Sequence, residues 1–384
     1  MTFPFAAGDL PSAAYAAALA CLPGVGPGWL VAVLAERSPR DAWYAVLTGE
    51  IGPPSRGRPR PGHEEWARAA RGADVTAQWA RLRRAGIDVF WPRSPGYPAV
   101  LRQGPAPAGV LFSAGTLDGL GERRRVAIVG TRRCTSEGAD ISYRLGYDLS
   151  AAGVCVVSGL ALGIDGAAHA GALAAGQDAL GSGPAPGGTV GVAASGVDVV
   201  YPRQHAGLWR EMVRVGAVLS ETPPGQPAQA WRFPSRNRLI AGLAEMVVVV
   251  ECHARGGSWH TVDAATKRGT DVGAVPGSVR SAASVGTNRL LHEGAVPVRG
   301  AQDVLDALGI FDARPAPALV PAPANPLGAL DKAVLAAVGW RPLCLDEVVE
   351  RSGVPVTAVV VALERLEDQG AVRDEAGWWV RKQN

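Results

Sequence analysis

Short apolar runs rich in β-branched residues alternate with amphipathic segments through the middle of the chain. The runs cover residues 126–130, 154–159, 189–195, 217–221, 246–252 and 271–275. Between the first two runs, Ile141, Leu145 and Leu149 recur every fourth residue, a spacing that predicts an amphipathic helix. Nearly continuous apolar strands that alternate with helices are typical of a parallel sheet covered on both faces. The pattern therefore predicts a doubly wound, Rossmann-like α/β domain.

Two Pro-rich stretches suggest where the chain divides. Residues 50–63 mix Pro, Gly and Arg, and residues 312–326 form a Pro/Ala spacer that we expect to be extended and semi-rigid. A length of 384 residues, at about 150 residues per domain, indicates two or three domains. We expect a helical domain over residues 1–84, a Rossmann-fold domain over 85–311, a linker over 312–326 and a winged-helix domain over 327–384. A Gly/Pro-biased segment at 176–188 predicts a surface loop inside the middle domain.

The first domain contains a short turn rich in glycine. Residues 22–28, LPGVGPG, are followed by an apolar run and resemble the hairpin of a helix-hairpin-helix or SAM-like domain. The backbone amides of such a turn can bind a phosphate. Because the turn has no cations near it, a structural or partner-docking role remains an equal alternative.

The last domain has the pattern of a winged helix with an unusual charge. Residues 345–353 and 356–370 predict its second and third helices, and residues 371–380 predict the wing hairpin. Residues 343–370 hold six acidic residues against two arginines, a net charge of −4. Because this sign opposes binding to duplex DNA, we expect the domain to contact protein or to regulate access to the Rossmann site.

Composition excludes several classes of protein. With 47% hydrophobic and 19% charged residues, wholesale disorder is excluded. A net charge of +3 means that any nucleic-acid surface is a local patch. Five cysteines without a CxxC pair predict neither a disulfide framework nor a zinc cluster. The N-terminal apolar run is preceded by Asp9 and by no Lys or Arg, which is wrong for a secretory signal. We expect a cytoplasmic protein with no membrane association, metal or cofactor.

Candidate chemistry follows the predicted strands, at the sheet edge where ligands of doubly wound folds bind. Gly130-Thr131-Arg132-Arg133 follows the first strand. The second is followed by residues 158–165, SGLALGID, a glycine-rich loop at a helix N-terminus that is suited to bind phosphate, or that merely permits a tight turn. Residues 233–238, FPSRNR, supply an aromatic ring and two arginines, the combination expected for single-stranded nucleic acid or, alternatively, for a solvated helix start.

Eight motifs together resemble a known family. VGTRRCTSEG, VSGLALGIDGAAHAGAL, GVDVVYP, SETPPG, FPSRNRLIAGLA, VVVVECHARGGSWHT, AVPG and GTNRLLHEGA match the DNA-processing protein A (DprA, also Smf) family in order and spacing. The resemblance covers about residues 90–300. It implies an extended Rossmann fold that binds and protects incoming single-stranded DNA and loads the RecA recombinase onto it during natural transformation. It implies no enzymatic activity and no catalytic residue, and single-stranded DNA-binding protein is a further candidate partner.

The resemblance also implies residue roles. The candidate DNA-binding residues are Gly130, Thr131, Arg132, Arg133, Ser158, Gly159, Leu160, Ala161, Gly163, Phe233, Arg236, Asn237 and Arg238. Asn237 lies between two arginines and is also suited to fix the loop. Asp165 and His169 are four residues apart, a spacing that metal ligands or an acid/base pair would share on one helix face. Nothing nearby supplies a third metal ligand, and the resemblance implies that the two residues anchor a helix. Leu290 and Leu291 are the candidate interface of a homodimer. The sequence departs from the family in its longer loop at 176–188 and in GGSWHTVDAA (256–265).

An enzyme is the competing hypothesis. Nucleotide phosphoribohydrolases use a related sheet with a PGGxGTxxE loop. Here Asp263, not Glu, follows Thr261 by two residues, and Trp259 stands where that motif needs Gly. These differences favour a binding protein.

Overall fold

The computed structural model describes residues 10–53, 62–102, 104–105, 107–117, 121–178, 186–311, 328–339, 342–368, 370–375 and 377–381. Most of the two predicted linkers lies outside these residues. Residue contacts divide the chain into two compact units, one of residues 1–133 and 142–315 and the other of residues 134–141 and 316–384. No helix in the described ranges has the length and apolarity needed to cross a membrane.

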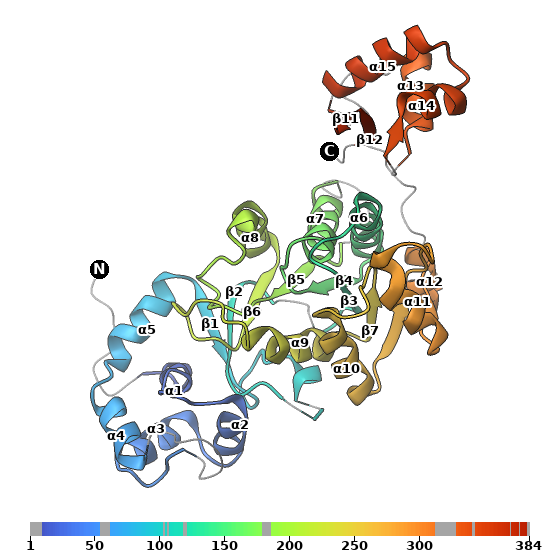
Figure 1. Cartoon of the computed structure of the whole chain (residues 1–384). Helices are drawn as coiled ribbons and strands as arrows, with labels where there is room; N and C mark the ends of the chain where they lie inside the picture. Colours follow the sequence, from blue (N-terminus) through green and yellow to red (C-terminus); the bar gives the residue numbers. More distant parts are fainter. Residues whose placement is uncertain are drawn as a thin grey trace. The chain divides into compact units, whose positions relative to one another are not determined.

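A large sheet forms the centre of the first unit (Figure 1). Among the described residues it has nine strands in the order β1-β2-β6-β5-β4-β3-β7-β8-β9. In this spatial order, neighbouring strands are parallel from β6 through β5, β4, β3, β7 and β8 to β9. β2 pairs with β6, and β1 with β2, in antiparallel fashion. Their bounds are β1 Ile87–Phe90, β2 Leu111–Gly115, β3 Arg125–Val129, β4 Cys155–Ser158, β5 Thr189–Val192, β6 Ala217–Ser220, β7 Met246–Val249, β8 Asp271–Ala274 and β9 Val296–Pro297.

The predicted doubly wound sheet is confirmed, and it is wider than predicted. Each of the six predicted apolar runs contains a strand, β3 to β8. The sequence pattern missed β1, β2 and β9. β9 has two residues, too few for an apolar period to be distinguished. β1, with the sequence IDVF, alternates between buried and more exposed positions and so has no continuous apolar run. They add an antiparallel pair at one end of the sheet and a short parallel edge at the other.

Helices cover both faces of this sheet (Figure 1). On one face α7 (Ile164–Asp178) contacts β3, β4 and β5, and α8 (Ala206–Val215) contacts β6 and β2. On the other face α9 (Arg232–Leu243) contacts β3 to β5, and α10 (Ser258–Arg268) contacts β7 and β8. α11 (Val285–His292) lies against β8, and α12 (Ala301–Ala307) follows β9 in the chain.

The helix predicted from Ile141, Leu145 and Leu149 is α6 (Ser136–Ala151), in which Leu145 and Leu149 are buried. It packs closely on α7. A Cβ at Gly171 of α7 would lie 1.9 Å from the carbonyl oxygen of Tyr143, so only glycine permits this approach. The expected surface loop at 176–188 is shorter than predicted, because α7 continues through Asp178; residues 179–185 lie outside the described part.

The N-terminal helices share a core with the sheet. They are α1 (Ser12–Ala20), α2 (Pro27–Glu36), α3 (Pro39–Leu47), α4 (His63–Arg71) and α5 (Val75–Arg84). α1 and α5 contact β1. One hydrophobic cluster joins Leu19 and Trp66 of these helices to Phe112 of β2 and Met212 of α8. The helices are therefore part of the same packed unit as the sheet, and the glycine turn between α1 and α2 is fixed against it.

The second unit contains the predicted winged helix. Its helices are α13 (Ala329–Ala337), α14 (Leu345–Ser352) and α15 (Val356–Asp368), and its strands are β10 (Leu343–Cys344), β11 (Val372–Glu375) and β12 (Trp378–Arg381). The strands pair in the order β10-β12-β11. Val348, Leu363 and Leu366 are buried in a separate core. The predicted second and third helices and wing therefore form as expected.

Candidate nucleic-acid interface

The loops at the carboxyl edge of the sheet converge where the direction of winding reverses. β3 pairs with β4 on one side and with β7 on the other, so the reversal lies between β3 and β7. Such a position is the usual ligand site of doubly wound folds. The amide of Thr131, after β3, donates to the carbonyl oxygen of Glu251, after β7, at 2.9 Å. The two loops are thereby joined, and the segment that carries Arg132 has a fixed position.

An exposed cation and two aromatic rings meet at this edge. The guanidinium carbon of Arg132 lies 4.7 Å from the centroid of the Phe233 ring. The ring of Tyr201 lies 5.6 Å from that of Phe233, tilted by 54°. Arg132 is exposed and Phe233 is half-buried, so both remain accessible to a ligand. We call Arg132, Tyr201 and Phe233 the aromatic–cation cluster.

The neighbours of Arg132 have different surroundings. Arg133 is also exposed. Gly130 and Thr131 are half-buried and hold the loop close to the next one. Gly163 has φ +78°, and a Cβ there would lie 2.5 Å from the carbonyl oxygen of Thr131. Glycine at this position is therefore required for backbone packing, whatever ligand the loop meets.

The glycine-rich loop turns its side chains inward. Ser158 is buried and its hydroxyl donates to the carbonyl oxygen of Ile128 at 2.5 Å. Leu160 is buried and has φ +59°, unusual for a residue other than glycine. Its carbonyl oxygen lies 3.0 Å from Nδ1 of His205. The side chains of Ser158 and Leu160 therefore do not face a ligand, which corrects the expectation for them; Ala161 is half-buried.

The carboxyl group of Asp165 accepts hydrogen bonds from the loop amides that were expected to bind phosphate. These are the backbone amides of Gly159 and Ala161. Burial raises the pKa of Asp165, while the charge of Arg236 and these two hydrogen bonds oppose the increase. The amides of this loop are thus already occupied by an internal carboxyl group at the N-terminus of α7. The predicted anchoring role of Asp165 stays a prediction that these contacts favour.

Arg236 is placed differently from the expectation. It is 6% exposed. Its Nη1 donates to the carbonyl oxygens of Gly159 and Val192, and its Nε donates to Oδ1 of Asn237 at 3.2 Å. Burial lowers the pKa of Arg236 to about 10. Since the guanidinium joins the ends of β4 and β5 to α9, it acts as an internal brace, and its predicted contact with phosphate is corrected accordingly.

The other two residues of this segment also have partners. Nδ2 of Asn237 donates to the carbonyl oxygen of Gly257 at 3.0 Å, which fits the loop-fixing alternative. Arg238 is half-buried and forms an ion pair with Glu221. Of the four arginines among the candidate DNA-binding residues, Arg132 and Arg133 are therefore exposed, whereas Arg236 and Arg238 have partners inside the protein.

His169 is fully buried. Its Nδ1 lies 2.7 Å from Oγ1 of Thr189, and because that hydroxyl donates to the carbonyl oxygen of Val156, Nδ1 is the donor. Burial lowers the pKa of His169 to about 3, and the charges of His205 and Arg236 act in the same direction. The ring is neutral and links α7 to β5.

The two leucines predicted at a dimer interface are not equally placed. Leu290 is buried in the core beneath α11. Leu291 is half-buried and packs against the same core. The homodimer interface at these leucines stays a prediction, and of the two only Leu291 keeps part of its surface accessible to a partner.

The residues that separate this chain from the phosphoribohydrolase pattern lie on α10. Thr261 is buried, Asp263 is exposed, and Trp259 is half-buried with the guanidinium carbon of Arg289 4.9 Å from its ring. Trp259 of α10 therefore packs against Arg289 of α11, where the phosphoribohydrolase motif would have a glycine in an open loop.

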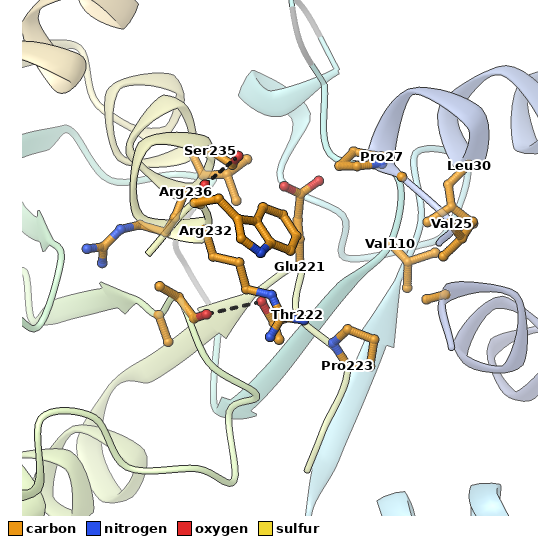
Figure 2. A pocket seen from close by; sticks show the side chains of 16 residues that line it. Val25, Pro27, Leu30, Val110, Glu221, Thr222, Pro223, Arg232, Ser235 and Arg236 are labelled. Atoms are coloured by element: carbon orange, nitrogen blue, oxygen red, sulfur yellow. Dashed lines mark hydrogen bonds between the residues drawn. The ribbon is translucent and has the colours of Figure 1, made fainter. Parts of the chain in front are cut away.

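A pocket of about 120 Å³ lies beside the cluster, between α2 and the start of α9 (Figure 2). Figure 2 shows Arg232 on one side of it, Pro27 and Leu30 on the other, and the Glu221 carboxylate between them. Trp231 also lines the pocket. Trp231 is 64% exposed, and the Arg232 guanidinium carbon lies 5.1 Å from its ring. The pocket therefore has an accessible aromatic wall.

Sequence reasoning missed Tyr201 and Trp231. Tyr201 lies in the segment after β5, at the same sheet edge as the other candidates, so its aromatic ring was a usable signal. Trp231 lies two residues before Phe233. An aromatic so close to FPSRNR fits the composition expected of a single-strand site.

The fold and this edge define a Rossmann-type protein with a polar, aromatic ligand site. The chain belongs to the DNA recombination-mediator protein A family, whose profile matches residues 88–309; that of the DprA winged helix domain matches residues 315–377. It is 37% identical over 229 residues to the DNA processing protein DprA of Bacillus subtilis, a match that covers 60% of this chain and 74% of that protein.

Solved structures of the family resemble this one. DNA processing protein A from Streptococcus pneumoniae matches with a TM-score of 0.62 and 31% identity, over 78% of this chain and 98% of that chain. DNA processing protein A from Helicobacter pylori, whose structure is described in terms of its single-stranded DNA binding mode, matches with a TM-score of 0.51 and 25% identity. That match covers 58% of this chain and 95% of the other.

Proposed function

We propose that this protein binds single-stranded DNA at the carboxyl edge of its sheet. The stacked arrangement of Arg132 on Phe233 carries the proposal. A guanidinium neutralises phosphate, and an aromatic ring stacks on bases without regard to sequence. Tyr201 beside Phe233 adds a second ring. The single-strand binding of the Helicobacter pylori relative supports the same function here.

The bound strand is passed to the RecA recombinase. The family description as a recombination mediator supports this step. In this role the protein acts in the cytoplasm, protects DNA taken up during natural transformation and exchanges the strand with single-stranded DNA-binding protein. The test is RecA filament assembly on a strand precoated with that protein. We expect faster assembly with this chain than without it, and no acceleration would contradict the mediator role.

The function is binding and not catalysis. A direct check is incubation with AMP and other nucleotides, followed by assay for released base. Base release that disappears in Asp263→Ala would establish the competing enzyme hypothesis and contradict the proposal.

The protein acts as a homodimer through the region around α11. Two DNA sites set side by side would let one strand engage both and increase its effective affinity. Because Leu291 packs partly on the core, Leu291→Arg is assessed by light scattering together with a thermal melt. A folded monomer is expected, and a variant that melts like the wild type but remains a dimer would place the interface elsewhere.

Titration with single-stranded and duplex DNA at two salt concentrations tests the main proposal. We expect preference for the single strand and a salt dependence set by the number of phosphates neutralised. Phe233→Ala should weaken single-strand binding by about 1–3 kcal/mol if a base stacks on the ring. Equal affinity for both forms of DNA, or wild-type binding by Phe233→Ala, would contradict the assignment of this edge.

A further inference from the structure

The pocket beside α9 has features that the proposed function does not use. Trp231 is a large aromatic side chain that leaves 64% of its surface exposed. Exposed tryptophans are typical of binding surfaces more than of ordinary protein surface. Its indole lines a pocket that also includes Pro27 and Leu30 of the N-terminal helices and Glu221 and Thr222 after β6. The wall is therefore shared between two parts of the first unit.

The size of the pocket limits what it can hold. A volume of about 120 Å³ is small beside the roughly 300–1,000 Å³ of pockets for drug-sized ligands. It accommodates a single small ring system. A whole nucleotide, or a peptide segment of a protein partner, is too large to fit inside it.

The charged groups that line the pocket already have partners inside the protein. Its acidic group is Glu221, a carboxylate whose side chain is 15% exposed and which is fixed by an ion pair with Arg238 and by the amide of Gly109 at 3.3 Å. The guanidinium of Arg232 stacks on Trp231 and donates to the carbonyl oxygen of Pro227 at 2.7 Å. A neutral, planar group with hydrogen-bonding edges fits these surroundings better than an anion.

Trp231, which lines the pocket, and Phe233 of the aromatic–cation cluster both lie at the start of α9. Trp231 is the N-cap of α9 and already has helical φ and ψ of −70° and −18°, and Phe233 is the second residue of that helix. At 3.6 residues per turn, the two side chains leave the helix about 200° apart, on opposite sides of its start. A helix with its side chains is about 10–12 Å wide, which spans about three nucleotides at a stacked spacing of about 3.4 Å.

The start of α9 itself suits the strand that would join the two sites. Its first turn contains no acidic residue and begins with Arg232. Since helix N-termini ordinarily favour acidic side chains, a basic first turn fits a helix start that meets an external anion. A phosphate that crosses the helix N-terminus would leave one base on the Phe233 side and another on the Trp231 side.

We propose that the Trp231 pocket receives one nucleobase of the bound single strand, stacked on the indole. This inference rests on the proposed function and extends it by a second base site on the opposite side of α9. Trp231 then binds a base directly, and the N-terminal helices contribute to DNA binding through Pro27 and Leu30.

The test compares two protein variants on two strands of about 16 nucleotides, one of deoxythymidine and one with abasic sugars throughout. Both strands carry the same phosphates. Trp231→Ala should weaken binding to the deoxythymidine strand by about 5- to 150-fold and leave binding to the abasic strand unchanged. Trp231→Phe, which keeps a ring, should recover most of the loss, and the salt slope should stay as in wild type.

Tyr44→Ala is the matched control, because Tyr44 is also exposed and lies under an arginine, Arg40, but lies on α3 away from the pocket. It should leave both affinities unchanged. Equal losses on both strands in Trp231→Ala, or no loss on either, would overturn the base pocket. If the base pocket is overturned in this way, the proposed function still holds provided that the wild type binds the deoxythymidine strand and that Phe233→Ala binds it less tightly. If wild type binds neither strand, the proposed function fails instead.

Discussion

The guanidinium of Arg132 lies over the ring of Phe233, with 4.7 Å between the guanidinium carbon and the ring centroid. One residue follows β3 and the other begins α9, more than a hundred positions later in the chain. Each keeps the other in place, since a cation–π contact at an exposed site contributes about 0.5–1 kcal/mol. The pair therefore presents a charge and a stacking surface in a fixed geometry before DNA arrives, which reduces the ordering cost of binding.

Arg132→Ala should weaken single-strand binding to all sequences. The variant loses one phosphate contact, so the slope of log affinity against log salt should become shallower by about 0.7. Thermal stability should stay close to that of the wild type, because the side chain is exposed and its contact with Phe233 contributes only about 0.5–1 kcal/mol. Arg81→Ala, an exposed arginine on α5, is the control and should change neither quantity. An unaltered slope in Arg132→Ala would show that this guanidinium does not meet phosphate.

Arg236→Ala should act on stability before it acts on binding. The substitution leaves the buried carbonyl oxygens of Gly159 and Val192 without this donor, and each such group costs about 1–3 kcal/mol. It also removes the charge beside buried Asp165. The midpoint of thermal unfolding should fall by several degrees.

The comparison of the two arginine variants separates a brace from a ligand. Arg132→Ala should lose affinity at constant melting temperature, and Arg236→Ala should lose melting temperature with affinity per folded molecule nearly retained. If Arg236→Ala melts like the wild type and binds poorly, the guanidinium contacts DNA after all.

The sequence predicted the location of the site better than the role of each side chain. Strand-end position was sufficient to bring residues 130–133, the glycine-rich loop and FPSRNR to one edge. Strand-end position did not reveal that both Arg236 and Arg238 point into the protein. Two side chains two positions apart leave a helix on different sides, so the local pattern does not predict that both have internal partners. Their buried partners, the carbonyl of Val192 and the carboxylate of Glu221, come from distant strands that no local pattern connects to them.

The fold was predictable for a related reason. Five of the six predicted strands are buried along their whole length and β8 is buried in its second half, so each has a largely apolar run that was visible in the sequence. Antiparallel β1 and β2 have no such run, because β1 alternates between buried and more exposed positions and β2, LFSAG, contains a serine and ends in glycine. The shared core of Trp66 with Phe112 and Met212, which joins the N-terminal helices to the sheet, was not predictable because its members lie far apart in the chain.

Acid should destabilise the first unit through His169. Its pKa is about 3 in the folded protein against an ordinary value of 6.5, so the unfolded chain takes up the proton first. The stability that comes from keeping the ring neutral is complete above pH 6.5 and is lost as the pH falls toward 3, by up to about 1.4 kcal/mol per pH unit.

His169→Asn removes this titration and keeps an amide that can donate to Thr189. The measurement is the free energy of unfolding of both proteins between pH 7.5 and 4, taken as the difference between them so that the carboxyl groups cancel. The wild type should lose its advantage over the variant as the pH falls. A difference that stays constant with pH would mean that His169 titrates normally in the folded protein.

Removal of the winged helix should leave single-strand binding nearly intact. A chain that ends at Pro315 keeps the aromatic–cation cluster and all nine strands of the first unit's described sheet. The lost domain offers little to phosphate, because α15 presents exposed Val356, Val360 and Val361 and its sequence region is acidic. The affinity for a single strand should therefore stay within a few-fold of the full chain, with the same salt slope. A large loss of affinity with a shallower slope would instead assign phosphate contacts to the basic residues of the wing and its surroundings, Arg341, Arg373, Arg381 and Lys382.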